Sequence, residues 1–525
     1  MRWDFPYRSQ RMPTIAANVV ATGQPLAAWA GMRMIDAGGN AADAAIAAAA
    51  ALTVVEPTAN GLGGDAFAIA WDGALHGLNS SGRSPAGLAR SRFDALAAMP
   101  RTGWDPVTVP GCVAGWAALH RRLGSLPFDR LLEPAIAYAE GGFPVSPMTA
   151  AGWSRALRRY AGFPAWMDTF APAGRAPAPG EVVRLPDHAA TLRQIAATGG
   201  DAMYRGALAD RIDAAARAEG GELRAADLAA HEARWTDPWS IAYRGLEVHE
   251  LPPNGQGLAA LLALGILGHF DLAALPEDGA ESVHLQAEAM RAAFADAHRH
   301  VADPDHGGLD ARALLDPDRI AARARAIRPD RAGDWQPVRL PRSGTVYLCT
   351  GDASGMAVSF IQSNYEGFGS GIVVPGTGIA LQNRGAGFSL ERGHPNEYAP
   401  GKRPFHTIIP GFITRDGRAL AAFGVMGGPM QPQGHVQVAV RIADHGHNPQ
   451  SALDAPRWQV MDDGSLLLEP GFPAATADGL RERGHLVRVD DAGKAFFGGG
   501  QMAWRVPGAW IGASDPRRDG LALGR

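Results

Sequence analysis

The chain has 525 residues, of which 46% are hydrophobic and 19% are charged, and its formal net charge is −4. That length suffices for about two to four domains or for one large layered unit of helices and sheets. The nearly balanced charge gives no electrostatic reason to expect a nucleic-acid partner or binding to an anionic membrane. Cys112 and Cys349 are the only cysteines, too few for a disulfide framework or a zinc site, and they fit a reducing, cytoplasmic location.

The N-terminal stretch carries charges and a proline but no apolar run of the signal-peptide type. The longest apolar run, residues 44–55, is shorter than the ~18 residues that a membrane-spanning helix needs. We therefore expect a buried helix at this run and no insertion of the chain into a membrane.

The first half of the chain predicts helices at 25–37 and 40–56, the second of them apolar on every side and therefore interior. A glycine-rich turn at 61–65 then leads into two strands, 66–71 and 74–78, joined by Asp72-Gly73. A dinucleotide fingerprint needs a strand, then glycines, then a helix. The order here is reversed, so we expect no phosphate-bearing cofactor.

Residues 113–330 read as mostly helical, with a longer amphipathic helix over 282–299. His284, Glu288 and His298 of this helix do not have the spacing of a tight ligand set. A solvated helix face explains them better, so we expect no metal.

Residues 328–344 form a polar, proline-broken connector that passes abruptly into a hairpin pattern beginning at Thr345. Cleavage between Gly344 and Thr345 would leave a threonine whose hydroxyl lies beside its own α-amine. Such an amine has a pKa near 7.7–8.0, about right to accept the hydroxyl proton at neutral pH. The alternative is that Thr345 merely opens a strand.

Two further features each have a functional and a plain interpretation. Arg83, in a Ser/Gly loop, is either a carboxylate clamp or a solvated surface charge. Gly427 and Gly428 precede a predicted helix at 433–443 and are either oxyanion donors or turn residues.

Taken in order, the motifs resemble the gamma-glutamyltransferase family of N-terminal nucleophile hydrolases over nearly the whole chain. The matching segments are 34–44 (MIDAGGNAADA), 61–65 (GLGGD), 109–111 (VPG), 344–345 (GT), 367–371 (GFGSG), 402–404 (KRP), 427–428 (GG) and 513–517 (ASDPR).

The resemblance implies an α+β fold, a four-layer αββα sandwich of the N-terminal nucleophile hydrolase type. It further implies self-cleavage at Gly344–Thr345 into chains 1–344 and 345–525. These would stay associated as a heterodimer, or as a dimer of that heterodimer, and would need no cofactor. The implied catalytic residues are Thr345, Ser363, Gly427 and Gly428.

Several positions depart from the pattern of members that act on γ-glutamyl compounds. The family's substrate-carboxylate arginine aligns with Ser81, leaving Arg83 as the nearest arginine, and its acid for the α-amine aligns near Ala386. Ser363 replaces the threonine that hydrogen-bonds the nucleophile. The remaining substrate-binding positions align with Tyr365, His406 and Thr407.

Because most groups for an α-amino acid head are missing, the chain looks more like the oxamate amidohydrolase branch of the family. It is expected to hydrolyse the amide of a small, oxamate-like carboxylate donor through an acyl-enzyme on Thr345, with Arg83 holding the carboxylate. The alternatives are a gamma-glutamyltransferase or glutathione hydrolase, and an inactive scaffold member.

Overall fold

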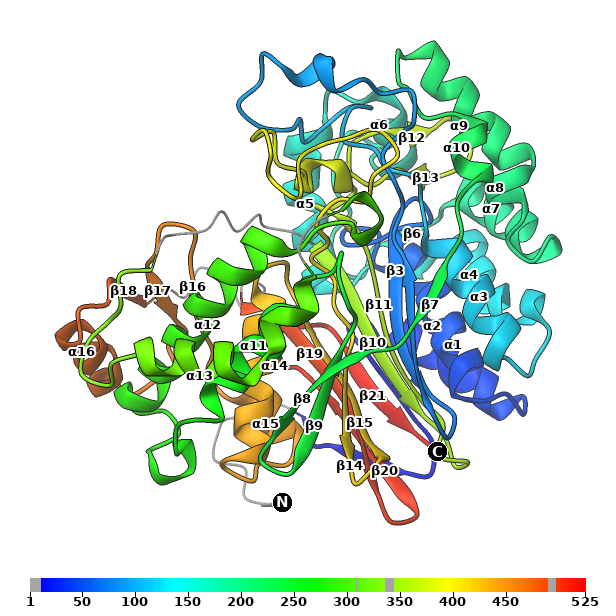
Figure 1. The fold of residues 1–525 in the computed structure, drawn as a ribbon. Helices are drawn as coiled ribbons and strands as arrows, with labels where there is room; N and C mark the ends of the chain where they lie inside the picture. Colours follow the sequence, from blue (N-terminus) through cyan, green and yellow to red (C-terminus); the bar gives the residue numbers. More distant parts are fainter. Residues whose placement is uncertain (1–10, 308–309, 336–343, 490–496) are drawn as a thin grey trace.

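The computed structural model describes residues 11–307, 310–335, 344–489 and 497–525. Within them two seven-stranded sheets, each antiparallel throughout, lie face to face (Figure 1). The first has the order β1 (Thr14–Ala16), β20 (Ala509–Ser514), β19 (Gly499–Val506), β15 (Arg418–Met426), β14 (Gly411–Arg415), β9 (Leu246–Glu250) and β8 (Trp239–Tyr243). The second has the order β21 (Leu521–Gly524), β2 (Val19–Thr22), β10 (Gly344–Gly351), β11 (Ala357–Tyr365), β3 (Asp65–Trp71), β4 (Leu75–Ser80) and β7 (Arg234–Thr236).

Helices cover the outer face of each sheet (Figure 1). On the second sheet and beyond its end lie α1 (Pro25–Asp36), α2 (Ala41–Val55), α3 (Cys112–Leu123), α4 (Phe128–Gly141), α5 (Pro147–Tyr160), α6 (Pro164–Phe170), α7 (Pro186–Ala197), α8 (Ala202–Arg205), α9 (Ala207–Ala218) and α10 (Ala225–Ala229). On the side of the first sheet lie α11 (Gly257–Leu267), α12 (Ala280–His300), α13 (Pro317–Ala326), α14 (Met430–Ala443), α15 (Pro449–Asp454) and α16 (Ala474–Glu482). Small sheets are formed by β5 (Phe143–Pro144) with β6 (Val182–Val183), by β12 (Val373–Val374) with β13 (Ile379–Ala380), and by β16 (Trp458–Val460), β17 (Leu466–Leu468) and β18 (Val487–Val489).

The alternation of side chains along the central strands accounts for the four layers. On β10, Val346 and Leu348 belong to the core under the helices, whereas Tyr347 and Cys349 belong to the core between the two sheets. Successive residues of a strand point to opposite faces, so a strand with a layer on each side is buried at nearly every position, as β10 and β11 are. The αββα sandwich expected from the family resemblance is confirmed.

Several predicted elements form with nearly the predicted bounds. Helix α2 is buried along its whole length, and Asn40 caps its N-terminus by accepting hydrogen bonds from the backbone N–H groups of Ala42 and Asp43. Strands β10 and β11 pair as the expected hairpin, with Gly355 of the turn at a φ of +92°. In the predicted helical stretch after Gly428 the helix begins at Met430, three residues before the expected 433.

Helix α12 departs from its prediction in one respect. His284 and Glu288 are fully buried rather than part of a solvated face, because they point into the packing between α12, α16 and the segment 328–335. The expectation of a solvated face is therefore wrong at these residues.

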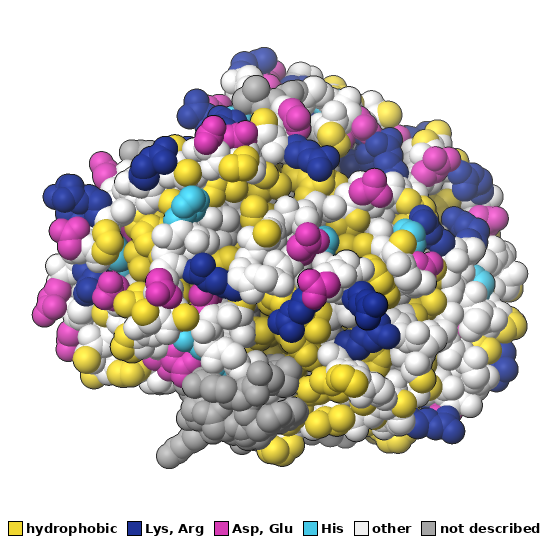
Figure 2. Space-filling view, turned by 60° about the horizontal axis from the view of Figure 1, so that its bottom comes forward, with side chains coloured by type: hydrophobic (Ala, Val, Ile, Leu, Met, Phe, Trp, Pro, Cys, Tyr) yellow, Lys and Arg dark blue, Asp and Glu magenta, His cyan; other side chains and the backbone are white. Residues whose placement is uncertain are grey.

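No helix within the described ranges is long and apolar enough to cross a membrane. On the face drawn in Figure 2, Lys and Arg side chains are interspersed with Asp and Glu, in keeping with the nearly balanced totals of 49 and 53.

Candidate active site

Thr345 lies at the end of a central strand of the second sheet and is fully buried. The β10–β11 register shifts between Gly344, which pairs with Tyr365, and Val346, which pairs with Gln362. This irregularity lets the Thr345 side chain fold back on its own chain. Its Oγ1–H donates to the Gly344 carbonyl at 2.7 Å, so the hydroxyl lies against the peptide bond that precedes it.

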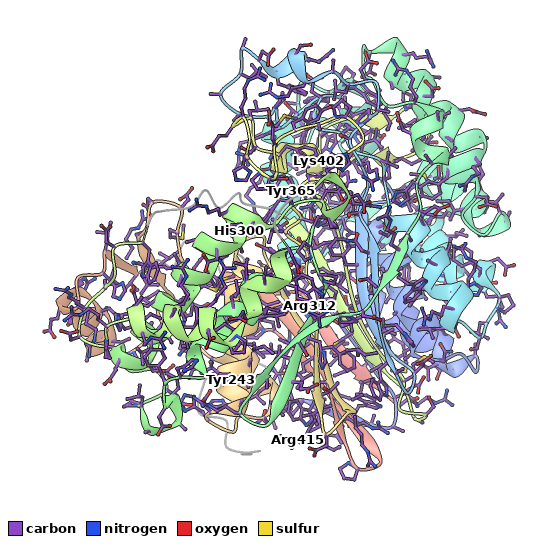
Figure 3. All side chains as sticks on the ribbon, in the orientation of Figure 1. Tyr243, His300, Arg312, Tyr365, Lys402 and Arg415 are labelled. Atoms are coloured by element: carbon purple, nitrogen blue, oxygen red, sulfur yellow. The ribbon has the colours of Figure 1, made fainter. Side chains whose placement is uncertain are left out.

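Ser363 of β11 lies beside the same carbonyl. Its hydroxyl donates to the Gly344 oxygen at 2.6 Å, accepts the Tyr365 backbone N–H at 2.7 Å, and stands 3.5 Å from Thr345 Oγ1. Two hydroxyls therefore polarise one carbonyl group. Figure 3 labels Tyr365 at this end of the sandwich, away from Tyr243 and Arg415 at the opposite end.

Arg384, from the short 3-10 turn Arg384–Gly387, enters this cluster with its charge unpaired. Its Nη2 donates to Ser363 Oγ at 3.2 Å and its Nη1 to Thr407 Oγ1 at 2.8 Å, while its guanidinium lies 4.4 Å from the centre of the Tyr365 ring. The side chain is fully buried, and within the described chain it forms no ion pair and its Nε has no hydrogen-bond partner. Burial lowers the pKa of Arg384 to about 10, so it remains charged at neutral pH.

The acids near this arginine are held by other groups. Glu366 accepts hydrogen bonds from Arg101, from Arg159 at 2.6 Å and from Asn383 at 3.0 Å. Although burial alone raises the pKa of Glu366, these two arginines bring it below its usual value.

Asp65 is likewise saturated. Its Oδ1 accepts the N–H groups of Gly82 and Gly111 and the Gln382 amide at 2.9–3.1 Å. Its other oxygen lies 3.0 Å from His406 Nε2. Neither Asp65 nor Glu366 has the free coordination that a substrate ammonium group would require.

His406 is thus hydrogen-bonded to Asp65, and Thr407 accepts a hydrogen bond from Arg384. Burial, and then the charge of Arg384, lower the pKa of His406 to about 4, so its ring is neutral at physiological pH. With Ile408 N–H approaching Nδ1 at 3.4 Å, the tautomer protonated on Nε2 fits both contacts. Of the two predicted substrate-binding neighbours, Thr407 directly contacts Arg384.

Gly427 and Gly428 form the turn that connects β15 to α14. Both have positive φ, +132° and +61°, which favours glycine. Their backbone N–H groups donate to no partner among the described residues, and Gly428 is buried. An unpartnered buried N–H group such as that of Gly428 is rare in folded proteins, and a developing oxyanion would satisfy it.

Two glutamines that the sequence did not single out frame this turn. Gln431, in the first turn of α14, places its Nε2 3.5 Å from Thr345 Oγ1 while its Oε1 accepts the Ile409 N–H at 3.0 Å. Gln256 donates to the carbonyls of Thr407 and Gly428 at 2.6 and 2.9 Å. No family motif or spacing pointed to either residue, since their neighbours come from distant parts of the chain.

Arg83 lies outside this cluster. Its guanidinium is bound by Asp303 at 2.9 Å, by Asp305 and by the Gly401 carbonyl at 2.8 Å. None of its contacts in the described chain is with Thr345, Ser363 or Arg384. With two carboxylates already on it, Arg83 is a poor receptor for a third.

Comparison with known proteins gives concordant results. The Gamma-glutamyltranspeptidase family model matches residues 27–524. A glutathione hydrolase-like proenzyme of Bacillus subtilis, YwrD, is 37% identical, covering 97% of this chain and 98% of its own. An oxamate amidohydrolase proenzyme of Klebsiella pneumoniae is 38% identical, covering 95% and 97%. The crystal structure of a cephalosporin acylase from Bacillus halodurans superposes with a TM-score of 0.94 at 47% identity, covering 100% of this chain and 99% of the other.

Proposed function

The chain belongs to the gamma-glutamyltranspeptidase family of enzymes, and from that premise we propose that it is a self-processing amidohydrolase with Thr345 as nucleophile. Its donor is a small amide that carries a carboxylate and no α-amine, of which oxamate is the simplest case and glutaryl amides are longer ones. Arg384 holds the carboxylate.

Maturation uses the contacts at Gly344. The Thr345 Oγ attacks the Gly344 carbonyl carbon, while the Ser363 hydroxyl polarises this carbonyl by donating a hydrogen bond to its oxygen. The Gly344–Thr345 C–N bond breaks, the nitrogen takes the hydroxyl proton, and an ester joins Gly344 to Thr345 Oγ. Water then hydrolyses the ester, leaving a carboxylate on residue 344 and a free Thr345 with its α-amine. The products 1–344 and 345–525 contribute strands to the same sheets, which keeps them together.

Turnover repeats this chemistry on an external amide. The α-amine of Thr345 takes the Oγ proton as Oγ attacks the donor carbonyl, and Gly427 and Gly428 N–H groups bind the oxyanion. The donor C–N bond then breaks, the proton passes to the departing ammonia or amine, and water hydrolyses the acyl ester on Thr345.

The main support for this class of donor is that the Arg384 guanidinium, which contacts Ser363 next to Thr345, has no ion-pair partner in the described chain. A buried guanidinium costs free energy unless a carboxylate meets it, and it binds one in a bidentate fork. Asp65 and Glu366 are occupied, so an α-ammonium group in the same pocket would lack an acid. The name of the oxamate amidohydrolase relative supports this donor class, and the names of an acylase of Pseudomonas and of the cephalosporin acylase support amide hydrolysis.

The test is a comparison of donors. We expect wild-type enzyme to release ammonia from oxamate, and nitroaniline from glutaryl-p-nitroanilide faster than from γ-glutamyl-p-nitroanilide, because only the last buries an unpaired ammonium. A large preference for the γ-glutamyl donor over its deamino analogue would instead favour the glutathione hydrolase function that the Bacillus relative's name suggests. A single uncleaved band on a denaturing gel, together with no turnover of any donor, would favour an inactive scaffold.

A further prediction concerns the oxyanion donors. Gly428→Asn should keep the fold, since Asn tolerates a φ of +61°, while its side chain crowds the N–H groups. We expect kcat to fall by about 10²–10³ with a small change in KM. The matched control is Gly417→Asn, at a φ of +68° in the exposed turn between β14 and β15, which should leave kcat unchanged. Equal kcat values for both variants would remove the Gly427–Gly428 turn from the site.

A further inference from the structure

Three side chains with metal-ligating atoms converge where α12 packs against α16. His284 and Glu288 lie one turn apart on the same face of α12, and His485 lies between α16 and β18. All three are buried, and one ligand atom from each lies within 4.8 Å of the others. We call this set the His284–Glu288–His485 cluster.

The hydrogen bonds fix which ring nitrogens carry protons. His284 Nε2 lies 2.7 Å from the Arg328 carbonyl, so it must be protonated, which leaves Nδ1 with a free lone pair in the neutral ring. That Nδ1 lies 2.7 Å from His485 Nε2, which must then donate to it. His485 Nδ1 is consequently an acceptor, and it has no hydrogen-bond partner in the described chain.

Glu288 presents the same pattern. Its Oε2 accepts the Gly333 N–H at 2.8 Å and the Trp335 indole N–H at 2.7 Å. Its Oε1 is buried without a hydrogen-bond partner, with Arg291 Nη1 at 3.7 Å as the nearest compensating charge. Buried acceptors without donors are unfavourable, and this cluster contains two of them, Glu288 Oε1 and His485 Nδ1.

We propose that His284, Glu288 and His485 bind one divalent transition-metal ion, zinc or a metal with similar ligand preferences. Two imidazoles and one carboxylate are a common zinc ligand set. Metal-bound histidines usually donate their other N–H to a carbonyl, as His284 does to Arg328, and ligating carboxylates are hydrogen-bonded in turn, as Glu288 is. Binding replaces the present hydrogen bond between the two rings: His485 moves its Nε2 proton to Nδ1, or turns its ring so that Nδ1 faces the ion. At Zn–N distances of about 2.0–2.1 Å, tetrahedral ligand nitrogens stand roughly 3.3 Å apart, against the present 2.7 Å between His284 Nδ1 and His485 Nε2.

The ion would also connect the two chains. His284, Glu288 and the supporting segment 328–335 precede Gly344, whereas His485 follows Thr345. Ala332 N–H donates to the Arg483 carbonyl at 2.7 Å, and Arg483 Nε to the Pro329 carbonyl at 3.2 Å, so this segment already lies against the 345–525 chain. This second part of the inference rests on the proposed cleavage; the binding of the ion does not.

The first experiment measures binding. Chelator-treated wild type and the uncleaved Thr345→Ala variant are titrated with Zn²⁺ by calorimetry and with Co²⁺ by visible absorption. We expect one ion per 525-residue unit in both proteins, with the d–d bands of a four- or five-coordinate Co²⁺ site. Using both proteins separates a failure of the site from a failure of self-cleavage.

Variants identify the ligands. His485→Ala and the isosteric Glu288→Gln should each lose the site, while Trp335→Phe, which removes only the indole hydrogen bond to Glu288, should weaken it by about 10-fold or more. Arg291→Gln should bind more tightly, because a competing cation is gone. The control is His269→Ala, at an exposed histidine, which should bind as wild type does. Unchanged affinity in both His485→Ala and Glu288→Gln, or no stoichiometric binding by wild type, would overturn the site.

The second experiment measures the connection between the chains. Cleaved wild type is unfolded in urea with and without Zn²⁺, and separation of the chains is followed by size-exclusion chromatography. Because an ion bound only to the folded state stabilises it, the urea midpoint should rise with Zn²⁺ in wild type and stay constant in His485→Ala. An equal rise in both proteins would show that the ion does not hold the chains together through this cluster.

Discussion

Thr345→Ala protein is expected to remain a single chain of residues 1–525 and to show no amidase activity. The variant lacks the hydroxyl that lies 2.7 Å from the Gly344 oxygen, so the acyl shift has no nucleophile. In the proposed mechanism the same atom carries the acyl group during turnover, so its loss should remove activity regardless of processing. Denaturing gels and intact-mass measurement report the chain, and the oxamate and glutaryl assays report turnover.

Thr345→Ser is the matched control, because it keeps a hydroxyl at the same position. It should still be cleaved, more slowly where the missing methyl loosens the buried side chain. Purified Thr345→Ala that still yields a second chain beginning at residue 345 would mean that a host protease cuts the connector. In that case the self-processing proposal is wrong.

Arg384→Ala is expected to lower kcat/KM for carboxylate-bearing donors by tens- to thousands-fold. Removing one partner of a buried charge pair typically costs roughly 2–5 kcal/mol. Arg384→Lys should recover little, since an ammonium does not reproduce the planar fork that contacts Ser363 and Thr407.

Arg384 also donates a hydrogen bond to Ser363, so substitutions of Arg384 can slow self-cleavage. The loss of carboxylate binding must therefore be measured separately from this effect. We would compare glutaryl-p-nitroanilide with valeryl-p-nitroanilide, which replaces the carboxylate by a methyl group, on the processed fraction of each protein. Wild type should strongly prefer the glutaryl donor, and Arg384→Ala should not. Comparing the ratio of kcat/KM for the two donors between the two proteins removes any loss of activity that affects both donors equally. Arg83→Ala, whose partners are Asp303 and Asp305, should retain the wild-type preference. If the preference disappears in Arg83→Ala and persists in Arg384→Ala, the carboxylate is held at Arg83, as the sequence suggested.

The sequence by itself determined the local elements. The apolar run of α2, the turn after β10 and the glycines before α14 act within a few residues, where propensity and side-chain periodicity decide the structure. The abrupt passage from a proline-broken connector into an apolar strand likewise marked Gly344–Thr345 as the junction. These features are local, and so they could be predicted.

Only the tertiary structure decided which charges face Thr345. Arg83 and Arg384 both stand in glycine-rich loops, and nothing local distinguishes them. Asp303 and Asp305, more than 200 positions away, approach Arg83, whereas Ser363 and Thr407 bring hydroxyls but no acid to Arg384. His406, which was predicted to bind substrate, lies 3.0 Å from Asp65. His284 and Glu288, which were predicted to form a solvated face, are buried against α16 and the segment 328–335. Whether a charged side chain has an ion-pair partner depends on residues far away in the sequence. Those residues come together only when the sheets and helices have packed.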